Sequence, residues 1–114
     1  MDYAVINKED LHRDGSNYEF EGYLYGDTNV SFIWLDLPPG EGPRLHRHPY
    51  AEVFIVQEGQ ASYTVGGCVL EVHAGQVVIA PPNVPHKFTN SGTGRLRQVD
   101  IHLSKHFITE WLED

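Results

Sequence analysis

The sequence predicts an all-β protein folded as an antiparallel sandwich or barrel. Short runs rich in β-branched and aromatic residues recur with the spacing of roughly 8–12 residues that is typical of such folds. Most of these runs end at Gly, Pro or Asn, which favour turns. With 114 residues, of which 40% are hydrophobic and 21% charged, the chain has the size and composition of one globular domain.

The expected strands follow one another along most of the chain. They span residues 29–37, 51–57, 60–65, 68–73, 76–80, 86–90 and 95–103. The segment PPGEGP follows the first strand and PPNVP follows the fifth, and neither segment can be a helix or a central strand. Near the end, SKHFITEWLED places Phe107, Ile108, Trp111 and Leu112 on one side at helical spacing, which predicts a short C-terminal helix.

Charge and cysteine content limit the kinds of partner and of site that the chain can have. Eight basic and sixteen acidic residues give a formal charge of −8, which argues against binding nucleic acid or an anionic membrane. The only cysteine, Cys68, excludes an internal disulfide and a Cys-based zinc site, and we expect it to be buried. No apolar signal core and no run of about 20 apolar residues is present. We therefore expect a cytoplasmic protein that binds a small molecule.

The stretch HRHPYAEVF, residues 46–54, places ionisable groups next to a strongly apolar run. His46, His48 and Glu52 share strand parity, so their side chains point to the same face, which continues with Phe54. An unpaired buried carboxylate is costly, and two neighbouring imidazoles repel each other when both are charged. A divalent cation satisfies all three groups, and His86 is the natural fourth donor.

Two segments resemble the paired motifs of the cupin superfamily. Residues 40–59 match G-x5-H-x-H-x3,4-E-x6-G, and residues 75–90 match G-x5-P-x-G-x2-H-x3-N except that Asn83 replaces a glycine. Asparagine is the residue best able to replace glycine in a left-handed turn. The matching positions are Gly40, His46, His48, Glu52, Gly59, Gly75, Pro81, His86 and Asn90. The resemblance implies a single cupin domain over residues 1–114 with a double-stranded β-helix, or jelly-roll barrel, to which the helical spacing near the end adds the short C-terminal helix.

The same resemblance implies roles for the four ionisable residues. His46, His48, Glu52 and His86 would bind one divalent metal ion per chain, which would be Mn, Fe, Ni, Co, Cu or Zn. An octahedral ion would keep two positions for water, substrate or dioxygen. A tetrahedral zinc ion held by all four residues would instead form a closed structural site.

Further residues are candidates for the cavity wall. Phe54 lies on the ligand face, where some cupin lyases have a tyrosine, so a lyase of that kind is disfavoured. Tyr63 is expected in the interior wall. In the last strand, Gln98, Asp100 and His102 share one face, and we expect that face to be solvated. The alternative is that this strand lines the cavity mouth. Substrate contacts would then involve Phe54, Tyr63, Gln98 and His102.

Two classes of function agree with these motifs. The first is a metal-dependent enzyme, of dioxygenase or isomerase type, that acts on a small polar molecule. The second is a non-catalytic module that binds or senses a small molecule or a metal ion. Strands 29–37 and 51–57 are apolar on both faces, as in Phe32 and Trp34 against Ile33 and Leu35, so we also expect a homodimer that covers the outer face.

Overall fold

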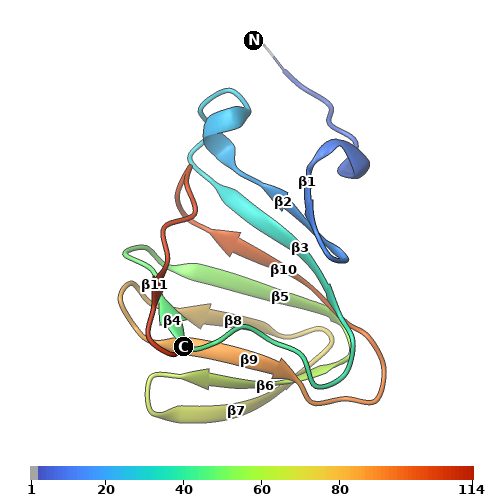
Figure 1. Cartoon of the computed structure of the whole chain (residues 1–114), viewed down its shortest axis with the longest axis vertical. Coiled ribbons are helices and arrows are strands. Elements are labelled where there is room, and N and C mark those ends of the chain that lie inside the picture. The colour runs from blue at the N-terminus through green and yellow to red at the C-terminus, as the bar shows by residue number, and fades with distance from the viewer. Residues whose placement is uncertain (1–2) are drawn as a thin grey trace.

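The computed structural model describes residues 3–114 and consists of two antiparallel sheets that face each other (Figure 1). The first sheet has the order β1-β2-β3-β10-β5-β8, and the second has the order β11-β4-β9-β6-β7. The strands of the first sheet are β1 (His12–Asp14), β2 (Asn17–Phe20), β3 (Ser31–Leu37), β10 (Leu96–His102), β5 (Glu52–Glu58) and β8 (Val77–Ala80). Those of the second are β11 (Glu110–Trp111), β4 (His46–Arg47), β9 (His86–Asn90), β6 (Gln60–Val65) and β7 (Cys68–His73).

All seven expected strands are present, and their bounds differ from the expected ones by two residues or fewer. The expected barrel is not closed: the hydrogen-bonded strands form two separate sheets. The edge strand β11 has two residues and the edge strand β8 has four, so these edges offer few backbone groups for a ladder that would join the sheets. The result is an open sandwich.

The core lies between the inner faces of the two sheets. It contains Leu35, Phe54, Val56, Ala61, Tyr63, Val72, Val78, Ala80, Phe88 and Leu96, which come from seven strands. Phe54 stacks edge-on against Tyr63 and Phe88, with ring centroids 5.2 and 5.8 Å apart. The expected interior position of Tyr63 is therefore confirmed, since its side chain is fully buried.

The expected C-terminal helix is wrong. The chain after β10 runs extended beside β4, where β11 pairs Glu110 with Arg47 and Trp111 with His46. Two short 3₁₀ turns, η1 (Lys8–Asp10) and η2 (Gly22–Leu24), are the only helical elements among residues 3–114. Tertiary contacts override the helical spacing here. The backbone N–H of Leu112 donates to the carbonyl of Leu45, and not to a carbonyl one turn earlier as it would in a helix.

The outer face of the first sheet is apolar across five strands. Cross-strand pairs align Tyr18 with Trp34, Phe20 with Phe32, Trp34 with Val99, Phe32 with Ile101, Val99 with Ile55, Ile101 with Val53, Ile55 with Val77 and Val53 with Ile79. In the single chain, Val77 and Ile79 are 58% and 62% exposed. Sheets that contact water on one side normally alternate apolar with polar residues, so this face has the composition of a covered surface.

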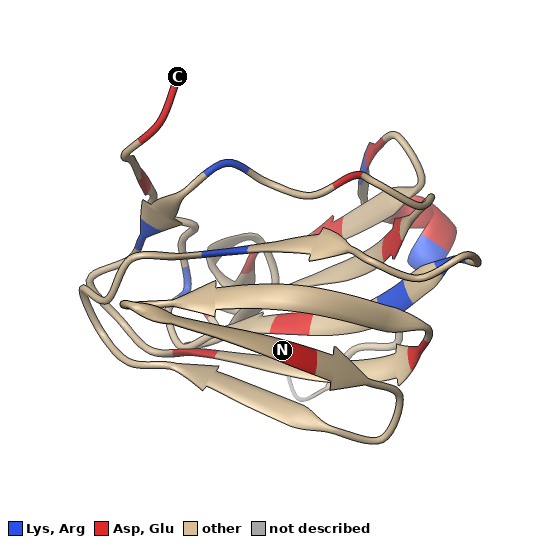
Figure 2. Ribbon diagram, turned by 90° about the horizontal axis from the view of Figure 1, so that it is seen from below, with Lys and Arg blue, Asp and Glu red and all other residues tan. Residues whose placement is uncertain are grey.

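The surface shows no single charged face. Acidic residues are scattered over loops and strands rather than collected in one patch, as Figure 2 shows. Cys68 is exposed, so the expected burial of this residue is wrong; it begins the edge strand β7, which is mostly exposed. Within residues 3–114, no helix has the length and apolar character needed to cross a membrane.

Candidate metal centre

Four ionisable side chains meet at one end of the sandwich. His46 lies on β4 and pairs across the ladder with His86 on β9, while His48 follows β4 and Glu52 begins β5. All four are buried, and one ligand atom from each lies within 4.8 Å of the others. The structure therefore brings together the same four residues that the sequence spacing had selected.

Each of the three imidazoles has its Nδ1 atom fixed by a backbone carbonyl. The Nδ1 atoms of His46, His48 and His86 lie 2.7, 2.8 and 3.0 Å from the carbonyl oxygens of Arg44, Ile108 and Val84. A carbonyl oxygen can only accept, so Nδ1 carries the proton in each ring. The Nε2 lone pairs are then free to bind a metal ion, an orientation typical of metal-ligating histidines.

The Glu52 carboxylate faces these nitrogens. Its Oε1 atom lies 2.9 Å from His48 Nε2 and 3.1 Å from His86 Nε2. Each of these two rings therefore has an acceptor oxygen next to both of its nitrogens. A neutral imidazole carries only one N–H and can donate to only one of the two acceptors. His48 Nε2 is buried and has no hydrogen-bond partner among the described residues. A shared cation satisfies both rings and the carboxylate, whereas protonation would place two positive charges side by side in the interior.

The electrostatics of the site favour this charge arrangement. Burial alone would raise the pKa of Glu52, but contacts with His102, His48 and His86 hold it well below its usual value, so the group is an anion. Burial lowers the pKa of His46 to about 4, opposed by its hydrogen bond to the Arg44 carbonyl. At neutral pH the site therefore combines a carboxylate with a neutral imidazole, which is the donor state that divalent metals require.

A second group of side chains holds the carboxylate from the other side. His102, on β10 opposite Glu52, places Nε2 3.1 Å from Glu52 Oε2, although the N–H is not aligned for a hydrogen bond. The Tyr50 hydroxyl accepts from the Ile108 N–H at 3.1 Å and lies 2.6 Å from His102 Nδ1. A hydroxyl that accepts there can donate its own proton to Nδ1, which leaves the His102 proton on Nε2, facing the carboxylate.

The polar face of β10 is not solvated as expected. Gln98, Asp100 and His102 are all buried, and the apolar Val99 and Ile101 lie on the outer face instead. Hydrogen bonds compensate this burial. The Tyr63 hydroxyl donates to Gln98 Oε1 at 2.7 Å, and Gln98 Nε2 donates to Asp100 Oδ1 at 2.6 Å. Burial, reinforced by the Glu52 charge, raises the pKa of Asp100 well above its usual value.

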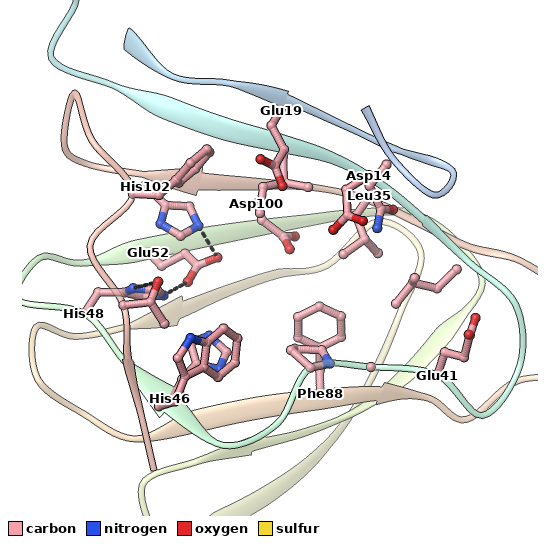
Figure 3. A pocket seen from close by; sticks show the side chains of 18 of the residues that line it. Asp14, Glu19, Leu35, Glu41, His46, His48, Glu52, Phe88, Asp100 and His102 are labelled. Carbon is pink, nitrogen blue, oxygen red and sulfur yellow. Dashed lines mark hydrogen bonds and ion pairs between the residues drawn. The ribbon is translucent and has the colours of Figure 1, made fainter. Parts of the chain in front are cut away.

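A cavity of about 690 Å³ opens from the candidate metal centre (Figure 3). Of the four expected substrate contacts, His102 lines this cavity, whereas Phe54, Tyr63 and Gln98 are buried in or beside the core and are not part of its wall. The wall also includes Asp14, Glu19, Glu41, Phe107 and Trp111, which the sequence reasoning had not selected. Asp14 and Glu19 lie on the hairpin β1–β2, where the segment DGSN was the available turn signal.

The family is decided by a match over most of the chain. The cupin domain matches residues 33–102, a segment that includes all four residues of the candidate metal centre. The chain belongs to the cupin family. The turn at Asn83 agrees with the family motif, since Asn83 has a positive φ of 65° where cupins have glycine.

The sequence is similar to that of an isomerase and to that of a transcriptional regulator. H2HPP isomerase of Bacillus subtilis is 34% identical over 77 residues, which are 67% of this chain and 32% of that protein. The HTH-type transcriptional regulator PuuR of Escherichia coli is 29% identical over 109 residues, 91% of this chain and 58% of the regulator. This cupin chain thus spans about a third of the isomerase and little more than half of the regulator.

Two solved cupin structures have the same fold. Oxalate decarboxylase of Bacillus subtilis superposes with a TM-score of 0.76 at 22% identity, covering 84% of this chain and 27% of that one. A double-stranded β-helix protein from Klebsiella pneumoniae superposes with a TM-score of 0.75 at 21% identity, covering 98% and 99%. At this identity the likeness concerns the fold, and the chemistry must be argued from the site itself.

Proposed function

We propose that this cupin binds one divalent metal ion through His46, His48, Glu52 and His86, and acts as a metal-dependent enzyme on a small polar molecule in the adjoining cavity. The observation that supports this most is the set of three imidazoles whose Nδ1 atoms donate to carbonyl oxygens, so that their Nε2 atoms are free to bind an ion. When bound, the ion would supply Lewis acidity and open coordination positions. Dioxygenase and isomerase chemistry both agree with this donor set, and the metal would be Mn, Fe, Ni, Co, Cu or Zn.

The protein's own residues have separate tasks in this proposal. His102 and Tyr50 hold Glu52 in place from the side away from the candidate ligands. Asp100, protonated because it is buried, holds a proton inside the cavity at a carboxyl group that a substrate can reach. Phe88, Phe107 and Trp111 give the cavity wall an apolar part that a substrate can contact. The likeness to an isomerase supports the isomerase alternative.

A second candidate is a module that binds a small molecule without turnover. The match to the regulator PuuR supports this alternative, because it extends over 91% of the chain and is not confined to the metal-ligand motifs. The same cavity and candidate metal centre would then serve recognition alone. The two candidates differ in whether the metal ion has an exchangeable position where a substrate can react.

Elemental analysis of the purified protein, followed by cobalt substitution, tests the proposal. We expect about one divalent ion per chain and a visible cobalt spectrum of five- or six-coordination that changes when azide binds an open position. A four-coordinate spectrum insensitive to azide would favour the non-catalytic module. Failure to take up cobalt, zinc or manganese at one equivalent would contradict the candidate metal centre itself.

A further inference from the structure

The inner face of β10 presents a carboxyl group to the cavity beside the candidate metal centre. Asp100 is 2% exposed and lines the cavity, and its side chain points into the cavity beside Glu52 in Figure 3. A buried carboxylate is normally paired with a basic side chain. Among the described residues that line this cavity, none is Lys or Arg. Burial without such a partner favours the neutral form of Asp100.

Two buried hydrogen bonds determine which Asp100 oxygen carries the proton. The Tyr63 hydroxyl donates to Gln98 Oε1 at 2.7 Å, so the Gln98 amide nitrogen faces Asp100 and donates to Oδ1 at 2.6 Å. Because Oδ1 accepts a hydrogen bond, the proton of the neutral acid is on Oδ2. The raised pKa of Asp100, caused mainly by burial, agrees with a neutral group. Asp100 is therefore a hydrogen-bond donor at Oδ2.

This donor faces the cavity. Within the described part of the chain, the hydrogen bond of Asp100 involves Oδ1 and not Oδ2. The protein encloses two side-chain nitrogen atoms without giving them a partner, His48 Nε2 and His102 Nε2, whereas Asp100 Oδ2 is not enclosed. An atom of a buried residue that is not enclosed is open to the cavity that its residue lines. A ligand in the cavity can therefore accept the Oδ2 proton.

A second donor without an aligned acceptor lies on the same strand face. His102, two residues further along β10, is 3% exposed and lines the same cavity. Its Nδ1 atom accepts from the Tyr50 hydroxyl at 2.6 Å, so its own proton is on Nε2. This N–H is not aligned with Glu52 Oε2, 3.1 Å away, and has no other partner among the described residues. Side chains two residues apart on a strand are neighbours on one face, so the two donors adjoin each other.

We propose that Asp100 donates a hydrogen bond from Oδ2 to the carbonyl oxygen of a small uncharged carbonyl compound, with His102 as the neighbouring donor. This inference rests on the proposed function, in which the cavity receives a small molecule beside the metal ion. A carbonyl oxygen has two lone pairs and no proton, so it suits a face that offers only donors. The apolar part of the wall suits the carbon skeleton of the ligand, and it includes Ile33, Leu35, Leu37 and Phe88.

The charges of the wall favour an uncharged group at Asp100 over an ionic one. An anion placed there would approach carboxyl groups on a wall without Lys or Arg, and like charges repel; these groups belong to Asp14, Glu19, Glu41 and Glu52. A cation would meet the proton on Asp100 Oδ2 and the N–H of His102, and neither group can accept from it. A neutral acceptor oxygen is the group that avoids both conflicts.

Two probes of the same shape test the hydrogen bond. Cyclohexanone and methylenecyclohexane differ only in whether an oxygen atom or a CH₂ group is joined to the ring. Their dissociation constants are measured on the metal-loaded wild type, Asp100→Leu and Asp100→Asn, and the ratio within each protein is compared between proteins, which cancels the difference in transfer from water. Leucine removes the donor, so the ketone should lose roughly ten-fold relative to the hydrocarbon. Asparagine keeps an N–H donor and should keep the wild-type ratio. An unchanged ratio in Asp100→Leu, an equal loss in both variants or no binding of cyclohexanone would overturn the proposal.

Infrared spectroscopy identifies the donor directly. A hydrogen bond weakens the carbonyl bond, so isotope-labelled cyclohexanone should vibrate at lower frequency in the wild type and Asp100→Asn than in Asp100→Leu. An equal frequency in all three proteins would contradict donation by Asp100. A second measurement does not require Asp100→Leu to fold. The band of the protonated Asp100 carboxyl, present in the wild type and missing from Asp100→Asn, should shift when cyclohexanone binds, and its absence or insensitivity would overturn the proposal.

Metal content measured on every sample separates this inference from the proposed function. A fully occupied metal site without the Asp100-dependent carbonyl shift contradicts the ligand class alone. A protein that binds no metal ion but shows the Asp100-dependent shift contradicts the proposed function and supports the role of Asp100.

Discussion

The Nδ1 atom of His48 lies 2.8 Å from the carbonyl oxygen of Ile108, a residue sixty positions further along the chain. This hydrogen bond fixes the tautomer of a candidate metal ligand by means of the segment that precedes β11. The neighbouring Tyr50 hydroxyl, which accepts from the Ile108 N–H, ties the same segment to His102. The C-terminal segment is therefore part of the candidate metal centre.

Removing any one imidazole should weaken metal binding. Replacement of His46, His48 or His86 by Ala takes away one neutral donor, and we expect a loss of at least about ten-fold in affinity, since outer-shell changes alone cost 10–100-fold. Elemental analysis measures the metal content of each variant, and competition with a fluorescent chelator measures its metal affinity. His73→Ala, on the exposed edge strand β7, is the control and should retain full metal content. Unchanged metal content in all three variants would rule out the ligand assignment.

Glu52→Gln should weaken metal binding while keeping the side-chain volume. The substitution removes the charge that balances the cation, so the melting temperature of the variant should become insensitive to chelator, whereas chelator should lower that of the wild type. Thermal melting with and without EDTA distinguishes the cases. A chelator-insensitive wild type whose melting temperature rises on Glu52→Gln would indicate a vestigial site, because a buried charge would have been removed without loss of a ligand.

Tyr50→Phe tests the link between the C-terminal segment and the site. The variant keeps the ring, which stacks on His48 with centroids 5.0 Å apart, but loses the hydroxyl that bonds His102 and Ile108. We expect roughly ten-fold weaker metal binding, the scale of second-sphere effects. Tyr23→Phe, on the exposed η2 turn, should change nothing measurable. Equal metal affinity in both variants would show that the segment does not orient the ligands.

Asp100→Asn should stabilise the protein at neutral pH. The raised pKa means that folding takes up a proton on Asp100, so its favourable contribution is complete below the ordinary value of 3.8 and is lost as pH rises through the folded value. Asparagine is neutral throughout and can still accept from Gln98. We expect a melting temperature several degrees higher at pH 7–8, equivalent to about 1 kcal/mol, and a difference that shrinks toward pH 4.

The opposite pH dependence would contradict the assignment of a neutral Asp100. Glu52, whose pKa is lowered, contributes stability that is lost only as pH falls through its own low folded value. Because Glu52 is present in both proteins, its contribution cancels in the comparison. The metal site must be saturated in both samples, so that linkage to metal binding does not enter.

We propose that the apolar outer face of the first sheet forms a homodimer interface. Trp34, Ile55, Val77 and Ile79 are between 37% and 62% exposed in one chain, and a second copy related by a two-fold axis would cover them. Light scattering at micromolar concentration should give twice the chain mass of 12.9 kDa, and Ile79→Lys should shift it toward the monomer. Thr89→Lys, exposed on the other sheet, is the control. A wild-type mass near that of one chain would contradict the proposed homodimer.

Much of this fold could be predicted because its strands carry local signals. The run QASYTV, for example, alternates in the way a half-buried strand requires, and β6 occupies these residues. Three members of the candidate metal centre were also predictable, since His46, His48 and Glu52 share parity on neighbouring segments. The β1–β2 hairpin was missed because strands of three and four residues carry too few alternating positions to be recognised.

The errors have a common physical cause. The face of β10 could not be assigned from alternation alone, because the buried polar residues are satisfied by partners far away in sequence, as with Gln98 and Tyr63. The C-terminal segment has helical spacing, yet its backbone hydrogen-bonds to residues that precede it by about sixty positions. The sequence pattern of a segment indicates only its local structural preference. The orientation of β10 and the extended C-terminal segment are determined instead by contacts with residues far away in the chain.

The pairing of β11 with β4 also determines when the site can form during synthesis. Arg47 and Glu110 are 63 residues apart in the chain, so His48 reaches its Ile108 acceptor only after the ribosome has released nearly all of the cupin domain. At about 5–20 residues per second, this delay lasts several seconds, longer than strands take to pair. A metal ion that binds at the candidate metal centre would therefore meet the geometry of the folded cavity, with His48 already oriented by the Ile108 carbonyl.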